Sequence, residues 1–527
     1  MVEWECGTDS EGFQSSLICN WLWRYRASPT SSMSIDLTLD RIRALASHLQ
    51  KPYTRPTCHI AGTNGKGSVT AILSTILRCS TPPLSVGRFN SPHLVSIYDC
   101  IFINNEPVAP DVYAKARSTV QTADMIHSVG VSSFELLTLT ALLVFEEAEV
   151  DIVVIEVGMG GRLDATNIIS DECILASALT AVDLDHQAFL GNTVESIARE
   201  KAAIARSGKP FVIGKQKHHA VIKIVQGMVE DDMLIFAQAA VKREWDESLD
   251  GPKPEQFSFA ISDLQANLSQ PVEINPLPPF SKPIFATLPL YGEHQLENLG
   301  IAVSMVSALL THSCTGRLSP SIHARITPET IVRGIQSTKW PGRLSLHTIV
   351  LPRSSSNHAA RSLTVLADGA HNPASSTTLG NFIEQLLDLS ATRSQTSIAP
   401  ISLTYILALS QSPPKQPHDT LSPLLLPAIH HQREKMNVAL VRFTPPDGMP
   451  WVKSVSPSEL RRAVLEVAPG ASTWASDDDK PIEKQLSDAL VWAGTHQQDT
   501  GKNGDGLVVL AGSLYLVADL YRFMKLP

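Results

Sequence analysis

Along the first two thirds of the chain, short apolar runs alternate with longer stretches in which apolar residues recur at a helical period. The runs that predict buried strands are Thr57–Ala61, Ile152–Ile155 and Ile174–Ser177, and the helical stretches are Ser68–Leu77, Phe134–Glu147 and Thr193–Arg206. A further helix is predicted after Met33, with Leu37, Ile42, Leu45 and Leu49 on one face. Strand–helix alternation is typical of a parallel sheet covered by helices, so we expect an α/β fold.

A second, smaller α/β block is predicted after residues 340–343. Its strand candidates are Thr364–Ala367, Thr404–Leu409, Ala439–Phe443 and Leu507–Ala511, and its closing helix runs from about Leu514 to Met524. Polar or proline-rich stretches predict surface loops or insertions at 312–320, 351–361, 389–400 and 411–434. We therefore expect two domains, at 33–338 and 339–527, after an unassigned N-terminal extension over 1–32.

Composition supports two globular domains and excludes several classes of protein. A chain of 527 residues is too long for one core, and 43% apolar with 18% charged residues is ordinary for a globular protein. The formal charge of −9 argues against a nucleic-acid partner, and no apolar run is long enough to span a membrane. Seven scattered cysteines and an acidic N-terminus predict a cytoplasmic protein with reduced thiols, and leave a mitochondrial pool open.

The strongest chemical signal is the glycine-rich turn that joins the first strand to a helix. It comprises Gly62, Thr63, Asn64, Gly65, Lys66, Gly67 and Ser68. Backbone N–H groups in such a turn converge on phosphate oxygens, and the helix N-terminus favours negative charge. Lys66 would reach the outer phosphates and Ser68 could place its hydroxyl on Mg²⁺. The spacing departs from the common phosphate loop, and a tight turn without ligand is the alternative.

Two further groups follow apolar strands in the first block. Glu156 ends a buried strand, where a carboxylate can hold Mg²⁺ or cap a neighbouring helix. His186 follows another strand, and a lone histidine is more often structural or solvated. Lys201 shares an apolar helical stripe with Val194, Ile197 and Ala198. It therefore needs a partner or a chemical modification, unless its chain reaches out to solvent at the edge of the stripe.

In the second block, Arg343 follows a Pro-Gly turn, and a strand leads into Asp368-Gly369-Ala370-His371-Asn372-Pro373. A cation and an acid–histidine–asparagine cluster at a strand end could hold nucleotide phosphate and ribose. A turn punctuated by Asn-Pro is the alternative.

Taken together, these residues resemble the folylpolyglutamate synthase and dihydrofolate synthase family, within the Mur-type ligases. The motifs that carry the resemblance are Gly62–Ser68, Ser91–Leu94, Ser133–Glu135, Glu156–Asn167, Asp185–Gly191, Arg199–Lys201, His294–Asn298, Trp340–Arg343, Asp368–Pro373 and Gly512–Tyr515. The resemblance implies an N-terminal Mur-ligase-type ATPase domain with a phosphate loop and a parallel sheet, followed by a smaller C-terminal α/β domain. It also implies a monomer acting on small molecules.

The resemblance assigns roles residue by residue. The implied nucleotide site comprises Gly62, Thr63, Asn64, Gly65, Lys66, Gly67, Ser68, Asn298, Arg343 and Asp368. The implied Mg²⁺ ligands are Ser68, Ser91, Glu156 and His186, and the implied pterin-side pocket comprises Ser133, Phe134, Glu135, Asp164 and Ala165. Lys66, Lys201 and His371 are the implied catalytic residues. Lys201 matches a lysine that is carbamylated in some members, where it faces a second Mg²⁺.

The implied reaction joins L-glutamate to dihydropteroate with ATP, through an acyl phosphate. Leu163-Asp164-Ala165 and Gly448-Met449-Pro450-Trp451 resemble the dihydrofolate synthase branch. A folylpolyglutamate synthase or a bifunctional enzyme is the alternative. A nucleotide-binding regulatory protein without ligase activity is a more distant one, and it leaves Lys201, Arg343 and Asp368 unexplained.

Overall fold

The computed structural model describes residues 38–252, 269–312, 322–351, 361–393, 402–411, 416–430, 436–446, 452–496 and 506–524. The extension over 1–32, the expected start of the first helix after Met33 and the Gly448–Trp451 motif lie outside these residues. No helix within the described ranges is both long and apolar enough to cross a membrane.

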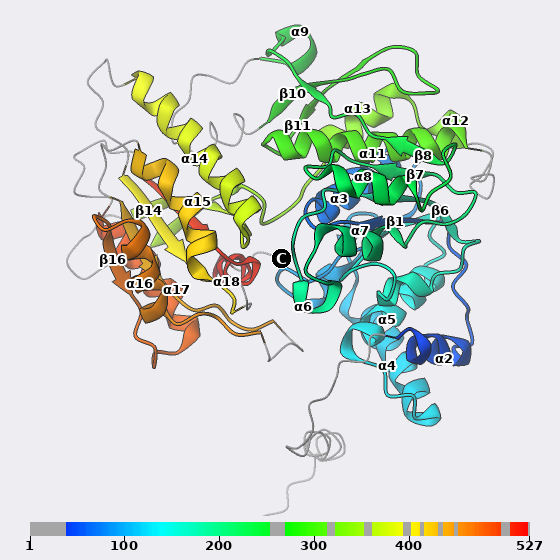
Figure 1. The fold of residues 1–527 in the computed structure, drawn as a ribbon, viewed down its shortest axis with the longest axis horizontal. Coiled ribbons are helices and arrows are strands. Elements are labelled where there is room, and N and C mark those ends of the chain that lie inside the picture. The colour runs from blue at the N-terminus through cyan, green and yellow to red at the C-terminus, as the bar shows by residue number, and fades with distance from the viewer. Residues whose placement is uncertain are drawn as a thin grey trace, which may run out of the picture. The chain divides into compact units, whose positions relative to one another are not determined.

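The first α/β block is built on an eight-stranded sheet (Figure 1). Its strands are β1 (Thr57–Ala61), β2 (Val86–Phe89), β3 (Ile101–Ile103), β4 (Glu106–Pro107), β5 (Ile152–Glu156), β6 (Ile174–Leu179), β7 (Phe211–Ile213) and β8 (Leu234–Phe236). The spatial order is β4-β3-β2-β5-β1-β6-β7-β8, and all pairs from β2 to β8 are parallel. The predicted parallel sheet is therefore confirmed, with β3 and β4 added antiparallel at one edge.

Helices cover both faces of this sheet, which explains the continuous apolar strands. Along β5, Ile152 and Val154 contribute to one buried cluster and Val153 and Ile155 to another. The first cluster includes residues of α3 (Lys66–Arg78), α11 (Glu293–Thr311) and α13 (Pro328–Gln336). The second includes residues of α2 (Asp40–His48), α4 (Pro110–His127) and α5 (Ser133–Glu147). The remaining helices of this block are α6 (Gln187–Leu190), α7 (Val194–Ala202), α8 (His219–Gln226), α9 (Glu247–Asp250) and α12 (Ile322–Arg325).

A three-stranded antiparallel sheet, which the apolar pattern did not predict, packs against the cluster around α3 and α11. It consists of β9 (Val241–Lys242), β10 (Gln270–Ile274) and β11 (Ile284–Leu288), in the order β11-β10-β9. Val272, Ala286 and Leu288 join the buried cluster, while Phe285 is exposed.

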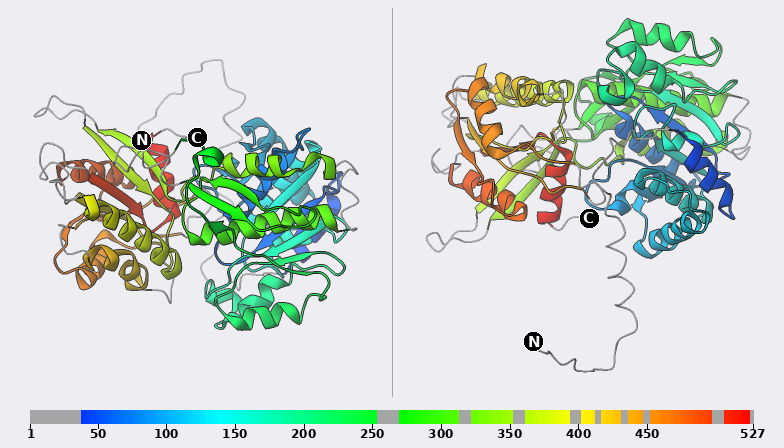
Figure 2. Two further views of the ribbon diagram at one scale, coloured as in Figure 1. Left: turned by 90° about the horizontal axis from the view of Figure 1, so that it is seen from above. Right: turned by 60° about the horizontal axis from the view of Figure 1, so that its bottom comes forward.

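The second block has a six-stranded sheet in the order β12-β13-β17-β14-β15-β16. Its strands are β12 (Ser345–Leu351), β13 (Arg361–Ala367), β14 (Ser402–Leu407), β15 (Asn437–Leu440), β16 (Ser472–Ala475) and β17 (Gly506–Ala511). Its helices are α14 (Pro373–Arg393), α15 (Pro417–His430), α16 (Pro457–Val467), α17 (Ile482–His496) and α18 (Leu514–Met524). Residues of α14, α15 and α16 pack in one cluster and those of α17 and α18 in another, on opposite faces of the sheet (Figure 2).

Several predicted extents differ from the structure, among them the strand predicted over 439–443, which is β15 over Asn437–Leu440. The stretch 411–434 was expected to be a loop, yet it contains α15 with Pro423 and Pro427 inside the helix. A Cβ at Gly380 of α14 would lie 2.4 Å from the Pro423 carbonyl oxygen, so this glycine lets the two helices pack closely where the prolines interrupt hydrogen bonding. The helix predicted over 193–206 ends at Ala202.

Candidate active site

The glycine-rich turn lies between β1 and the N-terminus of α3, at the carboxyl end of the parallel strands. Thr63 N–H donates to the carbonyl of Ala181 at 2.8 Å, which ties the turn to the segment after β6. Gly65 has φ +95° and immediately precedes the helix, in the left-handed region that favours glycine. The turn therefore directs the first backbone N–H groups of α3 toward the strand ends, as a phosphate-binding turn requires.

Two glycines of the turn are explained by side chains from elsewhere in the fold. A Cβ at Gly65 would lie 2.3 Å from Oδ1 of Asn298, so this predicted nucleotide residue on α11 lies directly against the turn. A Cβ at Gly67 would lie 2.4 Å from Cζ2 of Trp340. The unusual glycine between Lys66 and Ser68 thus makes room for an indole ring.

Lys66 and Glu156 meet at the strand ends. Lys66 Nζ lies 3.7 Å from Glu156 Oε1, and the two side chains are 15% and 9% exposed. Burial raises the pKa of Glu156, while the charge of Lys66, a hydrogen bond from Asn90 and the charge of Arg343 oppose that rise. The site therefore holds a poorly solvated carboxylate beside a lysine that can reach an anion.

Asn90 belongs to this group, although the sequence analysis did not select it. Its Nδ2 donates to Glu156 Oε2 at 2.8 Å and to Thr70 Oγ1 at 2.6 Å. Its Oδ1 is buried and has no hydrogen-bond partner among the described residues. Asn90 directly follows β2, a strand that the apolar pattern did not predict, and the next residue, Ser91, donates its backbone N–H to Glu156.

Lys201 is buried beneath the turn. Its side chain is on α7 with Ile197 and Ala198, as predicted, and Nζ donates to the Gly62 carbonyl at 2.9 Å. Burial, reinforced by the charge of Lys66, lowers the pKa of Lys201 to about 7, and the charges of Asp185 and Asp164 oppose this. The surroundings of Lys201 therefore favour its neutral amine.

His186 lies in the segment between β6 and α7. It has φ +50°, its ring is 48% exposed, and Nε2 lies 3.7 Å from Asp185 Oδ2. Burial would raise the pKa of Asp185, but its interactions with His186, His371 and Lys201 lower it. Asp185, which was not among the predicted site residues, is therefore a carboxylate that interacts with three of them.

The second block contributes Arg343 and Asp368. The Asp368 carboxylate accepts from the N–H groups of Leu344 and Ala370, both at 2.8 Å, and a Cβ at Gly369 would lie 2.4 Å from Arg343 Nη1. Asp368 thus shapes the loop that carries Arg343, and the nucleotide contact predicted for Asp368 stays a prediction.

His371 and Asn372 follow in the same loop. Asn372 Nδ2 donates to Asn64 Oδ1 at 3.3 Å, which connects this loop to the glycine-rich turn. His371 Nδ1 lies 2.7 Å from the Gly369 carbonyl oxygen. The structure therefore brings His371 to the same group of residues, and its catalytic role stays a prediction.

Two of the predicted pterin-side residues, Phe134 and Asp164, meet at the turn after β5. A Cβ at Gly158 would lie 2.4 Å from the Phe134 ring and 3.1 Å from Asp164 Oδ2. Asp164 is buried, which raises its pKa, and its oxygens accept from Met159 N–H and from the N–H and hydroxyl of Thr166.

Glu135, another predicted pterin-side residue, closes a capping box with Ser132 at the start of α5. Glu135 therefore has a local structural role. The substrate contacts predicted for Ser133, Phe134, Glu135, Asp164 and Ala165 stay predictions.

Comparison with known proteins decides the family. The chain is 32% identical over 492 residues to the dihydrofolate synthetase of Saccharomyces cerevisiae, covering 93% of this chain and 98% of the yeast protein. The sequence profile of "Dihydrofolate synthetase, C-terminal domain" matches residues 351–523. The chain belongs to the family of dihydrofolate synthetases and folylpolyglutamate synthases. These are ATP-dependent ligases, as the resemblance predicted.

Solved structures of family members confirm the fold class. Mycobacterium tuberculosis folylpolyglutamate synthase, in complex with ADP and AMPPCP, is 23% identical with a TM-score of 0.66, covering 93% of this chain and 96% of that one. A bifunctional folylpolyglutamate synthase/dihydrofolate synthase with Mn, AMPPNP and L-glutamate bound is 22% identical with a TM-score of 0.63, covering 94% and 96%. The two-block α/β architecture of this chain is thus the family fold.

The oxygen donors at the site fit a divalent cation such as Mg²⁺. Within the described ranges, no three or more His, Cys, Asp or Glu residues group as a metal site. Mg²⁺ does not need such a group, because it is commonly held by one or two carboxylates together with substrate phosphates. The site offers three oxygen donors of the required kind. They are the buried Glu156 carboxylate, Asn90 Oδ1, which has no hydrogen-bond partner among the described residues, and the hydroxyl of Ser91, whose backbone N–H bonds to Glu156.

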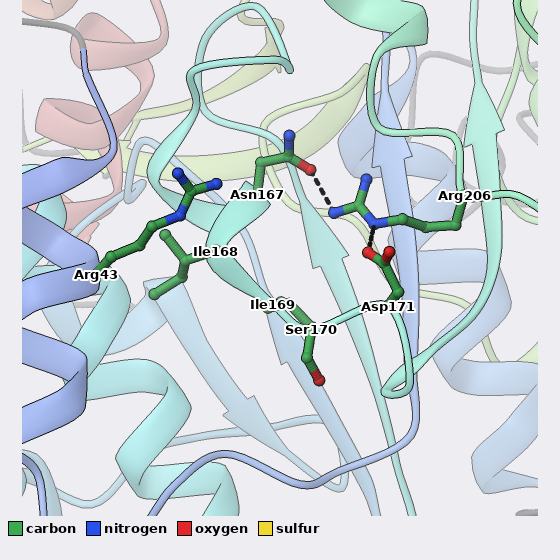
Figure 3. A pocket seen from close by; sticks show the side chains of 7 residues that line it. All are labelled: Arg43, Asn167, Ile168, Ile169, Ser170, Asp171 and Arg206. Carbon is green, nitrogen blue, oxygen red and sulfur yellow. Dashed lines mark hydrogen bonds and ion pairs between the residues drawn. The ribbon is translucent and has the colours of Figure 1, made fainter.

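A cavity of about 410 Å³ lies between α2 and the segment that joins α7 to β7 (Figure 3), and none of the site residues described above lines it. Arg43, Asn167, Asp171 and Arg206 line it together with Ile168, Ile169 and Ser170. Two arginines suggest an anion site, but the Arg206 guanidinium already bonds to Asp171, Asn167 and two backbone carbonyls. We therefore assign this cavity no role in catalysis.

Proposed function

We propose that this protein is a dihydrofolate synthase, which joins L-glutamate to 7,8-dihydropteroate as ATP is converted to ADP and phosphate. The observation that carries the proposal is the pairing of Lys66 with Glu156 at the mouth of the glycine-rich turn, in a chain related over nearly its whole length to yeast dihydrofolate synthetase. What is proposed is the identity of the acceptor, dihydropteroate, and of the products, dihydrofolate, ADP and phosphate.

The chemistry divides into two steps. The dihydropteroate carboxylate attacks the γ-phosphorus of ATP, the bond from that phosphorus to the β,γ-bridging oxygen breaks, and ADP leaves. The α-amine of glutamate then attacks the acyl carbon, phosphate leaves, and the amine proton is lost to solvent or a base. Lys66 stabilises the charge on the transferring group, and the backbone N–H groups of the turn bind its oxygens.

A divalent cation would be held by Glu156 with Ser68, Ser91 and His186, as the resemblance implies, and Asn90 Oδ1 is an additional candidate ligand. When bound, Mg²⁺ would offset negative charge on the phosphates. In this chain, Asn90 orients Glu156 through the 2.8 Å hydrogen bond, and burial keeps water from the carboxylate. A second Mg²⁺ belongs to the same proposal.

Carbamylation of Lys201 is part of the proposed function. Carbamylation requires a neutral amine, and the pKa of about 7 makes such an amine available. The modification would replace a poorly solvated cation with an anion, which relieves the repulsion between Lys201 and Lys66. His371, beside Asp185, is the remaining proposed catalytic residue.

The acceptor assignment rests on Leu163-Asp164-Ala165, which lies in the loop that contacts Phe134 through Gly158. The alternatives, a folylpolyglutamate synthase or a bifunctional enzyme, use an acceptor that already carries glutamate. A monomeric, cytoplasmic enzyme is expected, and light scattering during size-exclusion chromatography would measure its assembly state.

The experiment is ADP release with dihydropteroate and glutamate each omitted in turn. The proposal expects turnover only when both are present, with dihydrofolate as the product detected by mass spectrometry. A rate of ATP hydrolysis that does not depend on dihydropteroate would instead indicate a nucleotide-binding regulatory protein.

A further inference from the structure

Arg88 is a buried cation that the proposed reaction does not use. It lies on β2, two residues before Asn90, and is only 5% exposed. Its hydrogen bond from Nη1 to Ser74 Oγ is long at 3.5 Å, and its Nε has no hydrogen-bond partner among the described residues. Burial lowers the pKa of Arg88 to about 10, so the group stays charged at neutral pH.

Two aromatic rings flank this guanidinium, and the charge of the buried Glu156 carboxylate also acts on it. Arg88 Cζ lies 4.1 Å from the centroid of Phe102 and 5.4 Å from that of Trp340. Both distances are within the range of cation–π attraction, which strengthens when the cation is desolvated. Arg88 therefore interacts with both rings as well as with the charge of Glu156, and the rings are its contacts with the segment of Trp340.

Trp340 connects this buried cation to the nucleotide site. Its indole packs against Gly67, where a Cβ would come within 2.4 Å, and it joins the buried cluster around α3 and α11. Arg343 follows three residues later, after Pro341, which restricts the backbone, and Gly342, which has φ +74°. The charge of Arg343 acts on Glu156, so Arg343 lies on the nucleotide side of the same segment.

We propose that Arg88 is a positioning residue for the nucleotide: it holds the Trp340 indole against Gly67 and thereby places the Arg343 guanidinium beside the glycine-rich turn. The inference deepens the proposed function, because it takes the nucleotide as the ligand of Arg343. Burying a long-chain cation in a sheet costs free energy, unless favourable interactions of the charge offset its desolvation. A purely apolar side chain could fill the same volume, whereas only a cation attracts both ring faces.

The test is nucleotide affinity in four single variants and one double variant, Arg88→Met/Trp340→Leu, of the full chain. Arg88→Met keeps an unbranched side chain and removes the charge, Arg88→Lys keeps the charge and loses the planar stack, and Trp340→Leu removes the ring. Arg243→Met is the matched control, because Arg243 is also a largely buried arginine near an aromatic ring, but it is paired with Asp250 and follows β9 of the three-stranded sheet. Affinity for AMPPNP is measured by calorimetry and melting temperature by scanning fluorimetry.

Arg88→Met and Trp340→Leu should each bind AMPPNP about tenfold more weakly, with Arg88→Lys intermediate. The double variant should be no weaker than either single one, because both act through the same contact. In turnover assays, KM for ATP should rise while KM for dihydropteroate stays the same. Arg243→Met should lower the melting temperature without changing AMPPNP affinity.

Unchanged AMPPNP affinity in a folded Arg88→Met or Trp340→Leu protein would overturn the inference and leave Arg88 with a structural role. Additive losses in the double variant would also overturn it, since the two side chains would then act separately. Failure of the proposed function is distinguishable: the wild-type protein would then bind AMPPNP normally but release no ADP in response to dihydropteroate.

Discussion

Two buried carboxylates lie at strand ends, one in the eight-stranded sheet and one in the six-stranded sheet, and they differ in the groups that hold them. Glu156, at the end of β5, contacts the side chains of Lys66 and Asn90. Asp368, directly after β13, accepts hydrogen bonds from the N–H groups of Leu344 and Ala370. Burial raises the pKa of both.

The difference separates a ligand-binding carboxylate from one that shapes a loop. A carboxylate held by backbone N–H groups fixes local geometry, so Asp368 positions the segment of Arg343. A carboxylate held by a lysine and an amide can exchange the lysine for a metal or a phosphate-bound cation. We therefore expect substitution of the Glu156 group to affect turnover and substitution of Asp368 to affect stability and nucleotide affinity.

The largest effect is expected for Lys66→Ala. Removing a charge aimed at the transferring phosphoryl group should lower kcat by about 10²–10³ without unfolding the protein. Steady-state kinetics at saturating ATP measures this, with Lys215→Ala as control, since Lys215 is exposed and paired with Glu297. Near-normal turnover in a folded Lys66→Ala protein would remove Lys66 from the mechanism.

Glu156→Gln should lower kcat/KM by about 10² while leaving the melting temperature unchanged or higher. The sign follows from the raised pKa: ionised Glu156 is less favourable in the folded protein than in the unfolded chain, so its contribution to stability falls as pH rises through its folded pKa. Removing the charge removes this destabilising contribution. A large drop in melting temperature at neutral pH would show that the Lys66 pair is mainly structural.

Lys201 is expected to make activity rise with pH through about 7 and with added bicarbonate, since only the neutral amine reacts with CO₂. The folded pKa of unmodified Lys201, about 7, lies below the unfolded value of 10.5. The free energy of unfolding should therefore also increase as pH rises from about 7 to 10.5. Carbon-13 NMR with labelled CO₂ detects the carbamate, and Lys201→Ala should lose the signal and about 10–100-fold of activity. An active, Mg²⁺-loaded enzyme with a bare amine would contradict the proposal.

Asp368→Asn should have the smallest effect on chemistry. The amide can still accept one backbone hydrogen bond but not both, which should lower the free energy of unfolding by about 1–3 kcal/mol. KM for ATP should rise a fewfold while kcat is retained. Urea denaturation and steady-state kinetics measure the two effects, and a loss of kcat as large as that of Glu156→Gln would erase the distinction between the carboxylates.

The parts of the fold that the sequence could predict are those with a strong local pattern. The strand over 57–61 and the closing helix over 514–524 match the structure end for end, because continuous apolar residues and a clear helical period each specify one local structure. The antiparallel sheet containing β10 was missed, since its short strands depend on packing against α11. Helix α15 was missed because its prolines are tolerated only through contact with α14.

The site divides in the same way. Lys66 and Glu156 were predictable because both stand at strand or helix ends with a recognisable chemical role. Asn90 was missed, since a lone asparagine after a strand is also typical of a turn, and only the fold brings it to Glu156. Arg88 gave no signal, because its neighbours Phe102 and Trp340 are distant in the sequence.

The most direct test of the central claim is kcat/KM for dihydropteroate against that for a reduced folate that already carries one glutamate, at equal ATP, Mg²⁺ and glutamate. Both acceptors share the pterin ring, so they differ in where the reacting carboxylate lies. Misplacement by about 1 Å can cost about 10² in rate, so the account predicts a preference for dihydropteroate of at least about that size. Comparable values would show a bifunctional enzyme, and a preference for the glutamylated folate would contradict the assignment as a dihydrofolate synthase.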